Sequence, residues 1–318
     1  MSKLSHLIRN ENMKIYRRPR TWAMVAILLL AVSFMSGVMK WDSGKTDSTG
    51  WEQRLTEENA NYEQTLTENT DLGEGDQHWM QEQLAKNDYY IEHGINPYEL
   101  NLWNYVNSSA SLIILVTLLT VVIAADMIAA EFSWGTVKLL LVAPASRTKI
   151  LLSKYIATLA FALLLLLLCF GAAFGAGGLL EGFGGVEQPY LTVDAGGAVH
   201  EGSMLLHVFR EYGLSIISLF MYVTMAFMIS AAFRSSSMAI AMSLLFMLIG
   251  NALSELLSRF AFVKYLLFSN IDLTQYMDGR TPLRPDMTLG FSIAMLVAYY
   301  VVFQLLAWLL FTKRDVAA

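Results

Sequence analysis

The residues best suited to recognising another molecule gather in the stretch 131–149, between two long apolar runs. This stretch predicts a short amphipathic helix at a membrane surface, because aromatic and aliphatic residues alternate there with small and basic ones. Glu131 suits the positive end of the helix dipole, and Pro144 is expected to end the helix. The apolar side, with Phe132 and Trp134, could dock into a groove on a soluble partner.

Basic residues before, within and after this stretch are expected to anchor helices at the lipid headgroups on one side of the membrane. These anchors are Arg17, Arg18, Arg147, Lys149 and Lys154. A structural turn held by such anchors, as any polytopic membrane protein could have, is the alternative interpretation of the stretch.

Motifs for enzymatic chemistry are missing from the sequence. A phosphate-binding loop needs a glycine, four further residues and then Gly-Lys-Ser/Thr, but Met39 stands where the fragment at Gly44 needs its first glycine. Neither His-Glu-x-x-His nor Gly-x-Ser-x-Gly occurs, and Cys169 is the only cysteine. The sequence therefore predicts no catalytic residue, no metal site and no bound cofactor, and a chain that is not an enzyme by itself.

Several residues inside apolar runs could line a path for a transported molecule: Asp126, Met225, Phe227 and Met228. Alternatively, the carboxylate of Asp126 reaches the nearby membrane interface, and the other three residues only pack or face lipid. Glu255 and Arg259 lie four residues apart near a helix end, so we expect them to form a local ion pair.

Six apolar runs of about 20 residues divide the chain, and each is long enough to cross a bilayer as a helix. They cover residues 22–39, 108–130, 155–176, 213–233, 238–257 and 289–311, and the third helix is expected to span 150–176. With 55% hydrophobic and 15% charged residues, the composition favours an all-α integral membrane protein. The first run is too long for a signal peptide, and no small-residue cleavage site follows it.

The distribution of Lys and Arg predicts the orientation of these spans. If the N-terminus lies in the cytoplasm, the short cytoplasmic segments, including 131–149 and the tail 312–318, carry most of the basic residues. The long segments 40–107, 177–212 and 258–288 then lie outside. An even number of spans returns the C-terminus to the cytoplasm, so both termini are expected there.

The first outside segment, 40–107, is rich in Asp and Glu and carries two sets of apolar residues at helical spacing. The first set is Leu55, Tyr62 and Leu66, and the second is Trp79, Met80, Leu84 and Ile91. A glycine-containing break at 73–75 separates the sets, which predicts two amphipathic helices in a small extracellular hairpin. A solvated acidic spacer is the alternative.

Three segments resemble the permease subunits of type-2 ABC transporters. In the connection after the second span, Glu131 is followed by Gly135-Thr136-Val137-Lys138, then by Pro144-Ala145-Ser146-Arg147 and a lysine that leads into the next span. The basic segment 1–20 is similar to the amphipathic interfacial helix that precedes the first span in that family. Residues 263–277 are similar to the short external helices before its last span.

This resemblance implies that the stretch 131–149 is a coupling helix that contacts a cytoplasmic ATPase. The contact residues would be Glu131, Trp134, Gly135, Thr136 and Lys138. It further implies a permease dimer, with a second copy or a sister chain, that binds two ATPase subunits and exports a substrate across a bacterial cell membrane. ATP and Mg²⁺ would be used by the ATPase. Membrane lipids are expected partners, whereas no basic stripe with interleaved aromatics indicates nucleic acid.

Two other function classes remain open at this point. The acidic segment 40–107 could make the chain a membrane sensor or assembly protein that binds a peptide, a cation or an envelope component. A secondary transporter would be expected to carry charges near mid-span and broken helices in paired halves, and Asp126 alone has that character. Peptides, lipids, ions and small drugs are all compatible substrates.

Overall fold

The structure is a computed structural model that describes residues 4–45, 50–69, 72–136, 145–185, 188–194, 196–277 and 280–313. Six of the described helices are long and apolar enough to cross a membrane, which is the number that the sequence predicts. They are α2 (Pro19–Lys45), the continuous helix of α5 (Leu102–Ser109), η1 (Ala110–Leu112) and α6 (Ile113–Ser133), then α8 (Arg147–Glu181), α9 (Met204–Ala232), α10 (Ser236–Leu256) and α12 (Leu289–Thr312).

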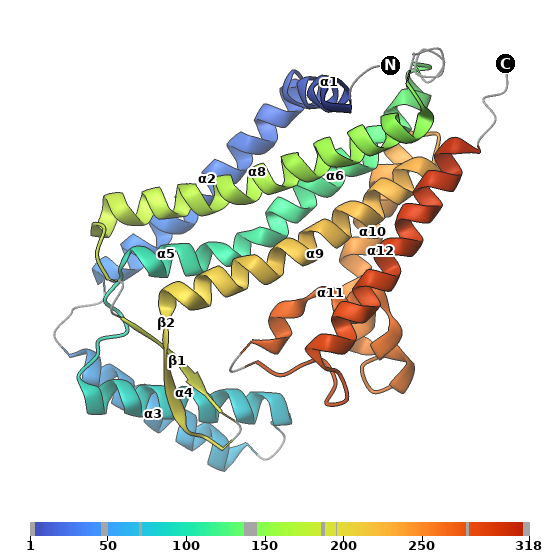
Figure 1. The fold of residues 1–318 in the computed structure, drawn as a ribbon. Coiled ribbons are helices and arrows are strands. Elements are labelled where there is room, and N and C mark those ends of the chain that lie inside the picture. Colours follow the sequence, from blue (N-terminus) through green and yellow to red (C-terminus); the bar gives the residue numbers. More distant parts are fainter. Residues whose placement is uncertain are drawn as a thin grey trace.

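These helices run side by side as one bundle, with both chain ends at the same end of it (Figure 1). We call this the terminal end; it also holds the short helix α1 (Leu4–Tyr16), the last turn of α6 and the first turn of α8. The opposite end carries the remaining elements. They are α3 (Trp51–Glu68), α4 (Glu74–His93), β1 (Pro189–Val193), β2 (Val199–Ser203), η2 (Ala261–Tyr265), α11 (Leu267–Ile271) and η3 (Leu273–Tyr276).

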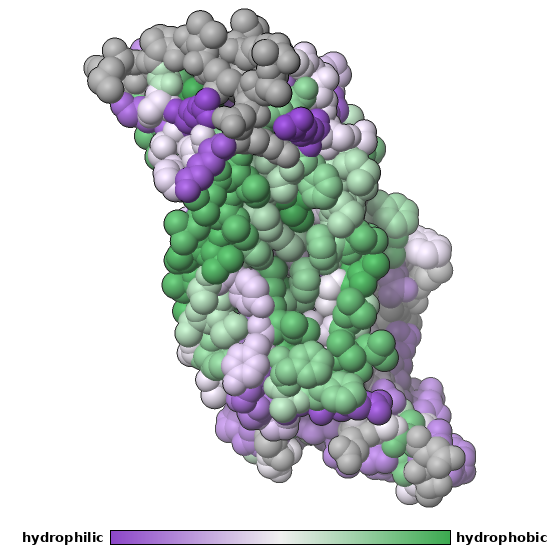
Figure 2. All heavy atoms as spheres, turned by 90° about the vertical axis from the view of Figure 1, so that its right-hand side faces the viewer, coloured by the Kyte–Doolittle hydropathy of each residue, from purple (hydrophilic) through white to green (hydrophobic). Residues whose placement is uncertain are grey.

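The core lies where α6, α8 and α9 pack together, and residues such as Val116, Phe161 and Leu219 are fully buried there. The outer helices α10 and α12 instead expose large apolar side chains, including Leu248 and Val301. On the face that these helices share, a broad apolar band separates two polar ends (Figure 2). A band of this kind is what a protein surrounded by lipid presents to the hydrocarbon.

A sharp bend joins α1 to α2 and fixes the first span relative to the bundle. Pro19 begins α2 at a position where its missing N–H is not needed. The hydroxyl of Thr21 donates to the carbonyl of Ile15 (2.6 Å), and the indole N–H of Trp22 donates to the carbonyl of Tyr16 (2.9 Å). The first turn of α2 therefore caps the end of α1, which packs against α8.

The predicted pair of helices in the segment 40–107 is present as α3 and α4. Asn59 links them, since its amide donates to Asp88 (2.8 Å) and accepts from the amide of Asn87 (2.8 Å). The rings of Tyr62 and Trp79 meet edge to face with centroids 5.7 Å apart. These contacts make α3 and α4 a packed hairpin rather than a solvated spacer.

The prediction of an all-α chain is wrong for the segment 177–212. There β1 and β2 pair as an antiparallel hairpin in which Pro189 lies opposite Ser203. The turn is held by Asp194, whose carboxylate accepts from the backbone N–H groups of Gly196 (2.8 Å) and Ala198 (2.9 Å). Tyr190 to Val193 favour a strand because they are aromatic or β-branched, apart from one leucine. The β2 strand leads directly into α9, which begins at Met204 rather than at 213.

We expect a pH-dependent contact between the middle of α3 and the segment that follows α4. The hydroxyl of Tyr98 donates to the carboxylate of Glu58 (3.0 Å), and partial burial together with this bond raises the pKa of Tyr98 from 10.0 to about 12. Because the neutral phenol is favoured in the folded state, the contact should hold below pH 10 and weaken as the pH rises through about 12. A difference titration of phenolate absorbance between the wild type and Tyr98→Phe measures this; a transition near the ordinary tyrosine value would contradict it.

Candidate functional site

The predicted contact residues Trp134, Gly135 and Thr136 form the turn that ends α6. Gly135 has a φ of 70°, in the left-handed region that glycine adopts without strain, and its N–H bonds to the carbonyl of Phe132 (3.1 Å). The indole of Trp134 is 62% exposed, and the guanidinium of Arg18 lies 4.6 Å from its ring centroid. Glu131 lies in the last turn of α6, which continues to Ser133, so the prediction that it stands at the start of a separate surface helix is wrong. Lys138 and the rest of 137–144 lie outside the described residues.

Glu131, one turn earlier, belongs to a cluster of two carboxylates and two ammonium groups. The Nζ of Lys154 lies 2.9 Å from Glu131 and 2.8 Å from Glu11, while the Nζ of Lys14 lies 3.2 Å from Glu131 and 2.9 Å from Glu11. The hydroxyl of Thr136 also donates to Glu131. The cluster is electrically balanced, which is the condition under which buried charges are tolerated.

Lys14 lies in α1, outside the spans, and its pKa reflects how strongly the neighbouring carboxylates stabilise its ammonium group. Burial opposes the charged form, but the hydrogen bond and charge of Glu11, joined by Glu131, outweigh it and raise the pKa of Lys14 above its usual 10.5. The ammonium group therefore remains charged throughout the neutral pH range, and α1 stays tied to α6 and α8.

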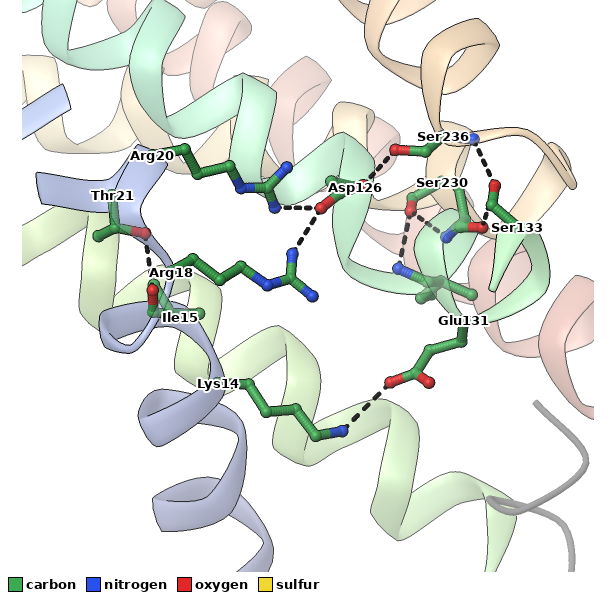
Figure 3. A network of polar contacts seen from close by, with 12 residues as sticks. Lys14, Ile15, Arg18, Arg20, Thr21, Asp126, Glu131, Ser133, Ser230 and Ser236 are labelled. Carbon is green, nitrogen blue, oxygen red and sulfur yellow. Dashed lines mark hydrogen bonds and ion pairs between the residues drawn. The ribbon is translucent and has the colours of Figure 1, made fainter. Parts of the chain in front are cut away.

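Asp126 forms a second cluster, five residues before Glu131 on α6. Its side chain is 2% exposed and accepts from Arg18 (2.7 Å), from Arg20 and from the hydroxyl of Ser236 (Figure 3). Arg18 and Arg20 come from the bend and the first turn of α2, whereas Ser236 begins α10. One carboxylate thus joins the first, second and fifth spans at the terminal end.

Serine hydroxyls complete the connections around the end of α6. Ser230 on α9 accepts from the backbone N–H groups of Ile128 (2.9 Å) and Ala129 (3.0 Å). Ser133 accepts from the backbone N–H of Ser236 (2.9 Å) (Figure 3). The last two turns of α6 are therefore bonded to α9 and α10 as well as to α1, α2 and α8. We call these clusters and serine contacts, from Glu11 to Ser236, the α6-end network.

Two of the predicted headgroup anchors have a different role in the structure. Lys154 is 1% exposed and faces carboxylates inside the protein, so it does not reach lipid headgroups. Arg18 contacts Asp126 and Trp134. Among the others, Arg147 donates to the carbonyl of Thr312 (2.7 Å) and so holds the end of α12. Arg17 is exposed and Lys149 is half-buried, which is compatible with the predicted anchoring.

The proposed path residues are also placed differently from the prediction. The carboxylate of Asp126 is 2% exposed and is enclosed by its partners Arg18 and Arg20. Phe227 is buried against the ring of Tyr155, with centroids 5.2 Å apart, and Met225 lies in the main core. Met228 is partly buried against the same core. These α9 residues pack because their helix lies at the centre of the bundle.

Sequence reasoning missed Glu11, Lys14 and Arg20 as members of the site, because it treated the segment 1–20 only as a basic helix that lies at the membrane surface. A usable signal was present: two acids near the inner end of the second span need partners, and the short basic segment before the first span supplies them. Each charge in the network is engaged in ion pairs, so the arrangement is suited to holding and moving helices together rather than to proton transfer.

Comparison with known proteins gives three matches. A family described as "Protein of unknown function (DUF2705)" matches residues 77–317. A Bacillus subtilis protein described as "Uncharacterized protein YhcI" is 41% identical over 316 residues, which cover 98% of this chain and 99% of that protein. Another, "Uncharacterized membrane protein YdbK" of Bacillus subtilis, is 31% identical over 218 residues, or 68% of this chain and 84% of that protein. The description of YdbK as a membrane protein agrees with the six long apolar helices among the described residues of this chain.

Proposed function

We propose that this chain, which belongs to the family described as "Protein of unknown function (DUF2705)", is the membrane-spanning subunit of an ABC exporter driven by a separate ATPase. The observation that carries the proposal is the α6-end network, together with the exposed turn that follows it. A force applied at Trp134 acts on the end of α6, whose side chains and backbone are bonded to α1, α2, α8, α9 and α10. A rigid junction of this kind is what a motor needs in order to move several spans at once.

In this proposal the terminal end faces the cytoplasm of a bacterial cell, with the α3–α4 hairpin outside. The basic residues of the terminal end and the acidic composition of the segment 40–107 support this orientation. Two ATPase subunits would bind a pair of these chains, either two copies or one copy with a sister permease. ATP binding would close the ATPases, and the closure would push on the stretch 131–149.

Co-purification tests the association. The chain should be expressed with the ABC ATPase encoded beside its gene, and the two should elute together from a membrane extract. Trp134→Ala removes an exposed ring from the proposed contact and should reduce recovery of the ATPase, whereas Trp79→Ala, at the opposite end, should not. If no neighbouring gene encodes such an ATPase, or if the purified pair does not associate, the proposal is wrong.

Gly135→Val should weaken this association further. Among the described residues, none has an atom within 4 Å of the Cβ that valine would add at Gly135, but valine disfavours the φ of 70° by about 1–2 kcal/mol. The turn should therefore change direction and misplace Trp134. Gly37→Val provides the control, because Gly37 lies in open space within α2, where valine is compatible with the helix. Equal ATPase recovery from both variants would show that the shape of the turn does not matter.

A second candidate function is sensing or assembly through the α3–α4 hairpin. The packed contacts of Asn59 and the link between Tyr89 on α4 and Glu201 on β2 (2.8 Å) favour a domain with a shape of its own. If this candidate is correct, replacing the hairpin with a short flexible linker should abolish function while leaving ATPase recovery unchanged. A secondary transporter is less well supported, because the arginine partners of Asp126 occupy the carboxylate that would have to exchange ions.

A further inference from the structure

A cavity of about 670 Å³ opens at the opposite end of the bundle from the α6-end network. It lies between the first turns of α6, the first half of α9, the second half of α10 and the segment from α11 to η3. Its volume falls within the range of roughly 300–1,000 Å³ that is typical of small-molecule sites. It shares Asp272, Thr274, Gln275 and Thr281 with a neighbouring crevice of about 400 Å³ that reaches α4.

The wall between α10 and α11 is closely packed. The ring of Phe268 lies so near Gly250 that an added Cβ would come within 2.4 Å of it. Between α9 and α10, the hydroxyl of Tyr222 donates to Asn251 (3.1 Å). Ile114 and Leu248 line the cavity and are themselves largely exposed, so the cavity opens between α6 and α10. A ligand could therefore enter from the surrounding lipid.

Two serines among the residues that line this cavity have hydroxyl groups with no partner in the part of the chain that the structure describes. The Oγ atoms of Ser254 and Ser269 are buried, and each residue is only 3% exposed, yet neither hydroxyl makes a hydrogen bond. Buried polar groups nearly always have a hydrogen-bond partner, so two unpaired hydroxyls beside one cavity indicate that a hydrogen-bonding molecule occupies it. A ligand with hydrogen-bonding groups would supply the missing partner.

The charge of the lining is acidic. Among the described residues, Glu211, Glu255 and Asp272 line the cavity, and no Lys, Arg or His does. Arg280 neutralises Glu211 at 2.7 Å. The predicted pair between Glu255 and Arg259 is not formed, and the carboxylate of Glu255 has no ion-pair partner among the described residues. The cavity therefore retains negative charge beside its orphaned hydroxyls.

We infer that this cavity binds an amphiphile with a net positive charge whose head is a primary ammonium group. The N–H donors of such a head match the hydroxyl oxygens of Ser254 and Ser269 and the carboxylate of Glu255, while Ile113, Leu248 and Phe268 accept an apolar body. A zwitterionic phospholipid fits less well, because its phosphate would meet Glu255 and Asp272. The inference concerns binding, so it stands or falls independently of ATP-driven export.

Binding of three probes to the chain in phosphatidylcholine nanodiscs tests the inference, with partitioning into empty nanodiscs subtracted. Dodecylammonium carries charge and N–H donors, dodecyltrimethylammonium carries charge alone, and dodecanol is neutral. Calorimetry should rank their affinities in that order. Ser254→Ala and Ser269→Ala should each weaken dodecylammonium binding by about 2- to 10-fold, and Glu255→Gln by about tenfold.

Controls separate ligand contacts from general damage. Ser36 also has a buried, unpartnered hydroxyl but lies on α2 away from the cavity, so Ser36→Ala should leave binding unchanged. Thermal unfolding without ligand should be no easier in Ser254→Ala or Ser269→Ala, because each removes an unsatisfied hydroxyl. Equal binding of all three probes, or unchanged dodecylammonium binding in the cavity variants, would overturn the inference. Equally strong competition by phosphatidylethanolamine would instead identify a lipid site and would also overturn it.

Discussion

Replacing Lys154 with methionine should lower the free energy of unfolding by about 3–5 kcal/mol, the range for removing one partner from a buried ion pair. Methionine fills a similar volume, so the loss would come from charge rather than from a void. Lys154 is 1% exposed and serves both Glu11 and Glu131. Without it, two nearly buried carboxylates would share only Lys14.

Reversible unfolding by dodecyl sulfate in mixed micelles measures this loss. Lys149→Met is the matched control: it lies five residues earlier on α8, and its side chain makes no ion pair among the described residues, so it should change little. Adding Glu11→Gln and Glu131→Gln to Lys154→Met neutralises the stranded carboxylates and should recover most of the stability. If the triple variant is as unstable as the single one, packing rather than charge explains the loss.

Asp126→Ala should lower the free energy of unfolding by about 3 kcal/mol, at the lower end of the range for removing one partner from a buried ion pair. The carboxylate itself is 2% exposed, but the side chains of Arg18 and Arg20 are 28% and 35% exposed and can turn towards water when their partner is lost. The bend between α1 and α2 should loosen together with the start of α10, since Ser236 shares the same carboxylate.

Hydrogen exchange of the amides in α1 and in the first turns of α2 and α10 measures this loosening, alongside dodecyl sulfate unfolding. Asp286→Asn is the control, because it removes a carboxylate that forms ion pairs at the opposite end of the bundle, at an exposed position. Its effect should be small, as for other surface ion pairs. Wild-type exchange rates in Asp126→Ala would contradict a role for Asp126 in joining the three spans.

The spans could be predicted from sequence because a bilayer requires long apolar runs, and no tertiary information is needed to find them. The α3–α4 hairpin was also predictable, since Leu55 and Tyr62 repeat at helical spacing. The helices in the structure are longer than the apolar runs in the sequence. They begin after capping residues such as Asn101 and Ser203, which lie outside those runs.

The α6-end network could not be predicted in the same way. Its ion pairs join residues far apart in the chain, such as Glu11 with Lys154 and Arg18 with Asp126, and no local pattern encodes such a pairing. Lys154 has the sequence context of a headgroup anchor, and only the packing of α1 against α8 turns it inward. The β1–β2 hairpin was missed because its two strands are short and lie within a long segment between spans.

The proposed function depends on transmission from the ATPase through Glu131 to the spans. The rate of ATP hydrolysis by the complex in nanodiscs tests it most directly, with Glu131→Gln compared with Glu57→Gln, an exposed acid on α3. The account predicts a fall of about fivefold or more for Glu131→Gln while the ATPase stays bound, in line with typical coupling free energies of about 1–3 kcal/mol. Wild-type hydrolysis by that variant, with the ATPase still bound, would contradict it.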